Sequence, residues 1–170
     1  MNLNLDNVHL DNVLGQALTS SVQLAYLTNN TSAALKNLEG HFSLGSWETL
    51  DVTLTLVDGP NGAPIESRLR ASLALMPGRM FEVVEPLKPA PPLFPALEGP
   101  NVVVQAHHIG AFMNDADIIV DGATRAGLPF YRYRGARGEI VFVDTRESTG
   151  LWLEALCFPF PGIGSLAASE

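Results

Sequence analysis

Four polar side chains interrupt segments that are otherwise apolar, and their types are those that bind metal ions: Gln23, Glu82, His108 and Glu154. A lone carboxylate in a buried strand is costly to ionise, so two of them imply a cation, a partner charge or solvent contact. One divalent ion satisfies both carboxylates, and mixed oxygen and imidazole ligation suits Zn, Ni, Co, Mn or Mg. The plainer alternative is that each side chain is a hydrogen-bonded core or cavity residue, the commoner role for a single glutamine or histidine on a strand.

An internal duplication relates the four positions in pairs. Two pairs of segments align, 22–26 with 107–111 and 80–84 with 152–156. In this alignment the glutamine matches the histidine, and the two glutamates match each other. The symmetry favours one shared site over four independent core residues.

Neighbouring candidates are set aside on geometric grounds. Because side chains alternate across a strand, His107 and His108 are predicted to face opposite ways, with only His108 looking into a cavity. Glu85 directly precedes a proline, where the strand should end, and is predicted to lie in solvent. His9 and His41 have no counterparts in the other half, and we interpret both as structural or surface residues.

The order strand, helix and three strands occurs twice along the chain. In the first half, strands are predicted at 21–28, 47–57, 67–75 and 79–84, and a helix at 33–38. In the second half, strands are predicted at 102–112, 128–133, 139–144 and 151–157, and a helix at 116–126 that ends at Gly127. The pattern predicts an α+β fold in which two βαβββ modules form a curved mixed sheet around a cavity.

Six prolines between positions 86 and 100 divide the two halves. Proline lacks a backbone donor and fixes φ, so we expect a semi-rigid linker there. The predicted organisation is an N-terminal extension (1–20), a first module (21–87), a Pro-rich linker (88–100), a second module (101–157) and a C-terminal tail (158–170). The apolar pattern of the extension fits neither helix nor strand. Whether the modules pair within one chain or across a dimer stays open.

Charge and composition exclude several kinds of partner. The net charge is −8 and lysine occurs only at positions 36 and 88, which argues against nucleic acid. No segment reaches the ~20 apolar residues of a membrane span, and the N-terminus lacks the pattern of a signal peptide. With Cys157 as the single cysteine, we expect no disulfide within the chain and a cytoplasmic location. Arginines 132, 134 and 137 form either a solvated hairpin or a docking site for a substrate carboxylate or phosphate.

The chain resembles the vicinal oxygen chelate superfamily, in particular its glyoxalase-like and methylmalonyl-CoA epimerase-like branch. The resemblance spans 21–156; it is clearest in 106–110, 115–127 and 143–154, and weaker in 22–27 and 81–86. It implies the glyoxalase/bleomycin resistance/dioxygenase fold, with one divalent metal ion held at Gln23, Glu82, His108 and Glu154.

The resemblance also implies an activity. We expect a metal-dependent isomerase, epimerase or lyase that stabilises the enolate of a small carbonyl substrate chelated through two oxygens. Glu82 and Glu154 are then both ligands and candidate catalytic bases. A homodimer is expected.

Two other activities are found in the same superfamily. Ring-cleaving dioxygenases need two histidines and a carboxylate around iron, and Gln23 occupies the place of one of those histidines. Bleomycin-resistance-like proteins bind small molecules without metal chemistry and typically lack the ligand set. The filled ligand positions favour the isomerase or lyase, with non-catalytic binding as the alternative.

Overall fold

The fold was analysed in a computed structural model that describes residues 12–158 apart from 42–43, 45, 61–63, 77, 88–92, 96 and 98. Each half of the chain forms one βαβββ module, so the predicted fold class is confirmed. The first module comprises β1 (Gln23–Thr28), α2 (Thr31–His41), β2 (Trp47–Asp58), β3 (Ile65–Met76) and β4 (Arg79–Pro86). The second comprises β5 (Val104–Phe112), α3 (Ala116–Ala126), β6 (Phe130–Gly135), β7 (Gly138–Val143), the short α4 (Arg146–Thr149) and β8 (Trp152–Cys157).

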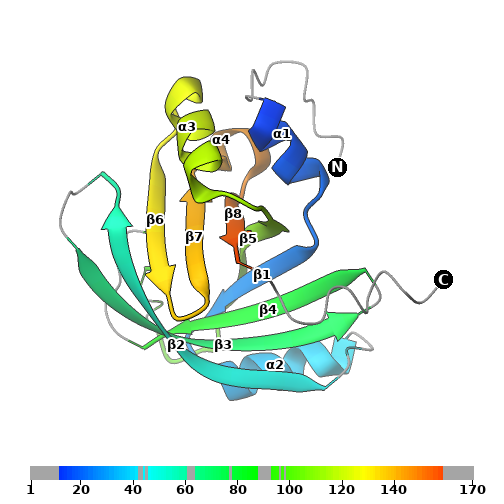
Figure 1. Ribbon diagram of the computed structural model, residues 1–170. Coiled ribbons are helices and arrows are strands. Elements are labelled where there is room, and N and C mark those ends of the chain that lie inside the picture. Colours follow the sequence, from blue (N-terminus) through cyan, green and yellow to red (C-terminus); the bar gives the residue numbers. More distant parts are fainter. Residues whose placement is uncertain are drawn as a thin grey trace.

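The two modules pair within one chain and close a single curved sheet (Figure 1), in the strand order β1-β4-β3-β2-β6-β7-β8-β5. Antiparallel pairing of β1 with β5 and of β2 with β6 joins the modules. Within each module the first strand runs parallel to the last, β1 beside β4 and β5 beside β8. The closed sheet therefore needs no second copy of the chain.

Helices cover the outside of the closed sheet. Helix α3 packs over the second module together with α1 (Asn12–Thr19), and α2 packs on the first module (Figure 1). Leu14 and Ala17 of α1 are fully buried in the cluster that contains Ile119 of α3. This helix was not predicted, because its eight residues span too few turns to establish a period within a longer apolar stretch. The remainder of the predicted extension, 1–11, lies outside the described residues.

The helix ends follow local capping chemistry. Helix α3 begins and ends as predicted, with the Asp115 side chain accepting from the Asp117 backbone N–H and Gly127 in the left-handed conformation at φ 67°. Helix α2 begins at Thr31, whose backbone N–H donates to the Glu85 carboxylate over 3.0 Å. The prediction that Glu85 lies in solvent is thus only partly right: the side chain is half-buried, because the strand persists and its carboxylate caps α2.

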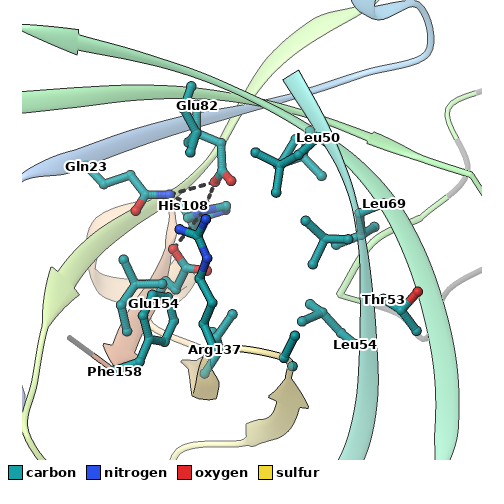
Figure 2. A pocket seen from close by; sticks show the side chains of 18 of the residues that line it. Gln23, Leu50, Thr53, Leu54, Leu69, Glu82, His108, Arg137, Glu154 and Phe158 are labelled. Atoms are coloured by element: carbon teal, nitrogen blue, oxygen red, sulfur yellow. Dashed lines mark hydrogen bonds and ion pairs between the residues drawn. The ribbon is translucent and has the colours of Figure 1, made fainter. Parts of the chain in front are cut away.

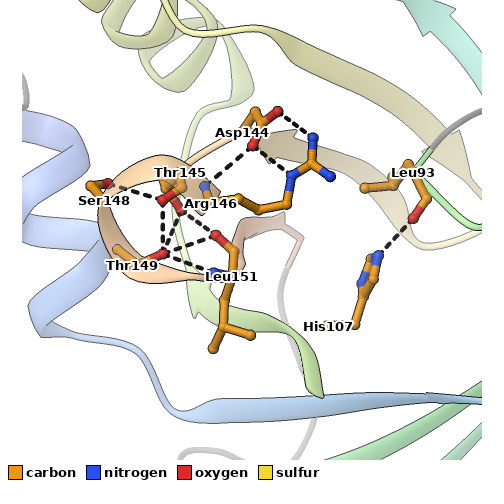
Figure 3. A network of polar contacts seen from close by, with 8 residues as sticks. All are labelled: Leu93, His107, Asp144, Thr145, Arg146, Ser148, Thr149 and Leu151. Atoms are coloured by element: carbon orange, nitrogen blue, oxygen red, sulfur yellow. Dashed lines mark hydrogen bonds and ion pairs between the residues drawn. The ribbon is translucent and has the colours of Figure 1, made fainter. Parts of the chain in front are cut away.

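The turn predicted at 146–150 contains the four-residue helix α4. Thr145 and Thr149 tie this turn together, and both hydroxyls donate to the Leu151 carbonyl (Figure 3). Arg146 lies over the Trp152 ring at 4.5 Å from its centroid and pairs with Asp144. These contacts fix the connection from β7 into β8, the strand that carries Glu154.

Part of the Pro-rich linker enters the interior of the closed sheet. Leu93 and Phe94 are almost fully buried and pack among residues of both modules. This cluster includes Leu56 from β2, Phe142 from β7 and Trp152 from β8. The linker therefore contributes to the core in addition to joining the halves. No helix within the described part of the chain is long and apolar enough to span a membrane.

Candidate metal centre

Strand register brings the four predicted residues to one place. In the parallel pairs, Gln23 is opposite Met80 and His108 is opposite Trp152. Each glutamate lies two residues beyond that partner, on the same face of its strand. The two modules therefore repeat the same arrangement, and the four side chains converge on one side of the interior cavity (Figure 2).

The polar atoms of this cluster are in direct contact. The Gln23 Nε2 donates to Glu82 Oε2 over 2.6 Å, and His108 Nε2 lies 3.1 Å from the same oxygen. His108 Nε2 also lies 3.2 Å from Glu154 Oε2. Ligand atoms of Glu82, His108 and Glu154 all fall within 4.8 Å of one another, close enough to bind a single ion.

Burial makes the charges of the cluster interdependent. His108 is 1% exposed and Glu154 is 4% exposed. Burial by itself lowers the pKa of His108, but the carboxylates of Glu154 and Glu82 beside its ring raise that pKa to about 9. Burial raises the pKa of Glu154, an effect that the His108 charge opposes. A divalent ion held by His108, Glu82 and Glu154 would take the place of the His108 Nε2 proton and offset the charge of both carboxylates.

Two buried oxygens of the cluster are available to bind a cation. Gln23 Oε1 and Glu154 Oε2 have no hydrogen-bond partner among the described residues, although the Glu154 oxygen has its ionic contact with His108. Unsatisfied buried oxygens are costly, and a hard or borderline divalent ion satisfies them. The Gln23 amide presents its nitrogen to Glu82, so half a turn of the amide is needed to present its oxygen as a ligand. The donor set fits a divalent metal ion.

The cluster opens into a mainly apolar cavity of about 230 Å³. Its walls include Leu50, Leu54 and Leu69 of the first module, with Phe142 and Ile140 of the second. Aliphatic and aromatic walls around one polar end are typical of a small-molecule site. Glu82, His108 and Glu154 line this cavity, so a ligand inside it can reach them.

The arginines of the β6–β7 hairpin have different surroundings. Arg132 and Arg134 both pair with Glu139; the Arg134 side chain is 65% exposed, as predicted for a solvated hairpin, whereas the Arg132 side chain is only 22% exposed. Arg137 has no ion-pair partner among the described residues. It lines the cavity and extends from the hairpin on the side of Glu82, His108 and Glu154 (Figure 2). The alternative of an anion-docking site therefore survives for Arg137 alone.

The prediction that His107 faces away from His108 is wrong. Ala25 pairs with His108 but Tyr26 pairs with Ala106, so β5 carries a bulge at the histidine pair. The extra residue breaks the alternation of side chains, and His107 points into the interior, where it is 7% exposed. The paired histidines gave no signal of a bulge in the sequence. His41 is exposed at the end of α2, as predicted, and His9 lies outside the described residues.

Comparisons with known proteins identify the fold. The chain matches no family model, and no curated protein matches its sequence. Methylmalonyl-CoA epimerase from Mycobacterium tuberculosis superposes with a TM-score of 0.54 at 14% identity, over 86% of this chain and 92% of that one. A Streptomyces coelicolor methylmalonyl-CoA epimerase variant in complex with 2-nitronate-propionyl-CoA gives 0.54 at 15%, over 83% and 97%.

A hypothetical protein from Bacillus halodurans is similar as well, with a TM-score of 0.52 at 16% identity over 79% of this chain and 91% of that one. Identities in this range establish a shared fold alone. The chain thus has the fold of methylmalonyl-CoA epimerase, and the fold that the family resemblance implied is confirmed.

Proposed function

We propose that the protein is a metal-dependent isomerase, epimerase or lyase that moves a proton on the carbon next to a substrate carbonyl. The observation that carries this proposal is the contact of Glu82, His108 and Glu154 at the polar end of an apolar cavity. Gln23 completes the proposed ligand set. A bound divalent ion supplies a Lewis acid for the negative charge that develops on the substrate oxygen.

The protein's own residues then have separate tasks. The apolar walls exclude water, which strengthens every electrostatic interaction in the cavity. Glu154 lines the cavity, so its carboxylate can reach a proton on a bound substrate and is the first candidate base. Glu82 lines the same cavity and is the second candidate base.

Arg137 supports a narrower substrate class within this function. A guanidinium at the edge of an apolar cavity, with no ion-pair partner among the described residues, is suited to a carboxylate or phosphate. We propose a carbonyl substrate with an anionic group that pairs with Arg137. The change Arg137→Ala should raise KM at least tenfold for such a substrate, with kcat retained, whereas Arg134→Ala should leave KM unchanged. A KM unaffected by Arg137→Ala would refute this narrower proposal.

Solvent deuterium exchange tests the proposed proton transfer. Metal-reconstituted protein is incubated in D2O with methylmalonyl-CoA and with smaller 2-substituted carbonyl acids, and incorporation at the carbon next to the carbonyl is followed by NMR. Metal-dependent exchange that disappears in Glu154→Gln is expected. A tightly bound carbonyl ligand that exchanges no proton with any metal would instead identify the non-catalytic binding protein.

A further inference from the structure

Because of the bulge in β5, His107 lies next to His108, a proposed metal ligand. Its ring stacks on Phe94 of the linker, with centroids 5.4 Å apart and planes inclined by 23°. The same ring meets His108 edge to face at 5.1 Å between centroids. His107 therefore contacts a proposed ligand from the side remote from Glu82 and Glu154.

Two hydrogen bonds determine where the protons of the histidine pair lie. His107 Nε2 is 2.6 Å from the Leu93 carbonyl oxygen (Figure 3), and a carbonyl oxygen only accepts, so Nε2 carries the hydrogen. In the tautomer whose hydrogen lies on Nε2, the His107 ring has its lone pair on Nδ1. This Nδ1 lies 2.8 Å from the Nδ1 of His108, which must then be the donor.

The position of the Nδ1 hydrogen determines which nitrogen of His108 can bind a metal ion. With the hydrogen fixed on Nδ1, a neutral His108 has its lone pair on Nε2, the nitrogen that faces Glu82 and Glu154 at 3.1 and 3.2 Å. A metal-binding histidine is commonly held in one tautomer by the acceptor that its other nitrogen finds. Here that acceptor is a second histidine, anchored in turn by a backbone carbonyl.

We propose that His107 is a positioning residue: it receives the Nδ1 hydrogen of His108 and thereby fixes the Nε2 lone pair of His108 toward the metal. The proposal rests on the proposed metal-dependent function. It gives the linker a role at the site, because the Leu93 carbonyl orients His107. Loss of such a supporting contact typically reduces metal affinity about 10–100-fold.

Two substitutions separate this role from simple packing. Phenylalanine at position 107 keeps a flat ring against Phe94 but offers no acceptor, whereas asparagine places an amide oxygen near the position of the lost Nδ1. We expect His107→Phe to weaken Zn²⁺ binding about 10–100-fold by calorimetry and His107→Asn to restore most of that loss. His41→Asn, at the exposed end of α2, is the control and should bind like wild type. Wild-type affinity in a folded His107→Phe protein would overturn the proposal.

A second readout does not depend on metal. Long-range ¹⁵N–¹H spectra of the histidine-labelled, metal-free protein should place the His107 hydrogen on Nε2 and a hydrogen on His108 Nδ1. A His107 hydrogen on Nδ1 overturns the proposal even if Zn²⁺ binds. Wild-type protein that binds no divalent ion contradicts the proposed function instead, and the spectrum still decides the tautomer, so the two failures are distinguishable.

Discussion

At the scale of single residues, the cluster depends on a glycine that supplies no ligand. Gly110 lies opposite Gln23 in the β1–β5 pair. A Cβ atom at position 110 would be 2.7 Å from the Gln23 Oε1 and 2.9 Å from the Gln23 Cβ. The second contact is with an atom held close to the backbone, so a change of rotamer cannot relieve it. Gly110 thus leaves the space in which the Gln23 amide lies.

The change Gly110→Ala should therefore displace Gln23 and weaken metal binding. We expect a loss in Zn²⁺ affinity of about tenfold or more by calorimetry, in a protein that remains folded by circular dichroism. Gly40→Ala is the matched control, because a Cβ there meets nothing within 4 Å, and it should leave the affinity unchanged. Equal affinities for the two variants would show that Gln23 does not belong to the site.

At the scale of elements, the β6–β7 hairpin is tied to α3 by a small charge network. Glu139 receives hydrogen bonds from Arg132 and Arg134, and Arg132 also bonds to Asp117 of α3 over 2.7 Å. The Arg132 hydrogen bond lowers the pKa of Glu139, with Arg134 acting in the same direction and burial opposing both. The network holds the hairpin from which Arg137 rises.

Acidification should loosen this network. Because the folded-state pKa of Glu139 lies below its ordinary value, its contribution to stability is present above about pH 4.5 and is lost as the pH falls through the folded-state pKa. We expect Glu139→Gln to lower the free energy of unfolding by about 1 kcal/mol at pH 7 and by less near pH 3, measured by urea denaturation. Exposed Glu147→Gln is the control. A loss of unfolding free energy in Glu139→Gln that becomes larger on acidification would contradict this role of the ionised Glu139.

The elements were predictable where local chemistry decides them. Helix α3 has its N-cap at Asp115 and its C-cap at Gly127, and both residue types are recognisable as helix ends in the sequence. The β5 bulge is different, because only pairing with β1 reveals that His107 has no partner there. The packing of α1 on α3 is also tertiary, and a helix of eight residues is too short to stand out from its flanks.

The candidate site was predictable because the chain repeats itself. Aligning the halves selects His108 and both glutamates without knowledge of the sheet, and the parallel register of each module preserves that equivalence. The supporting residues carry no such signal. Arg137 looks like its neighbouring arginines until the hairpin is built, and Gly110 looks like an ordinary glycine until Gln23 lies opposite.

At the scale of the whole molecule, the proposed site joins the two halves of one closed sheet. Gln23 and Glu82 come from the first module, whereas His108 and Glu154 come from the second. All four meet within a single chain, so the site is complete without a second copy. The expected homodimer stays a prediction. Metal binding should accordingly stabilise the molecule as one unit.

This coupling predicts a thermal shift. An ion present at about 100 times its Kd adds about 2.7 kcal/mol, which for a chain of this size raises Tm by about 5–10 °C. Differential scanning calorimetry should show one transition that moves upward with added Zn²⁺, Co²⁺ or Mn²⁺. Glu82→Gln and Glu154→Gln should each remove the shift, although they lie in different modules. Two separate transitions, of which only one moves with added metal, would disprove the shared site.

The most direct test of a metal centre is the stoichiometry of binding. Apoprotein prepared with a chelator is titrated with Zn²⁺ by isothermal calorimetry, and metal content is then measured after dialysis, for wild type, Glu154→Gln and the surface control Glu147→Gln. We predict one ion per chain in wild type and in Glu147→Gln, and none retained in Glu154→Gln. No retained ion in wild type, or the same content in all three proteins, would contradict the assignment of Glu82, His108 and Glu154 as a metal centre.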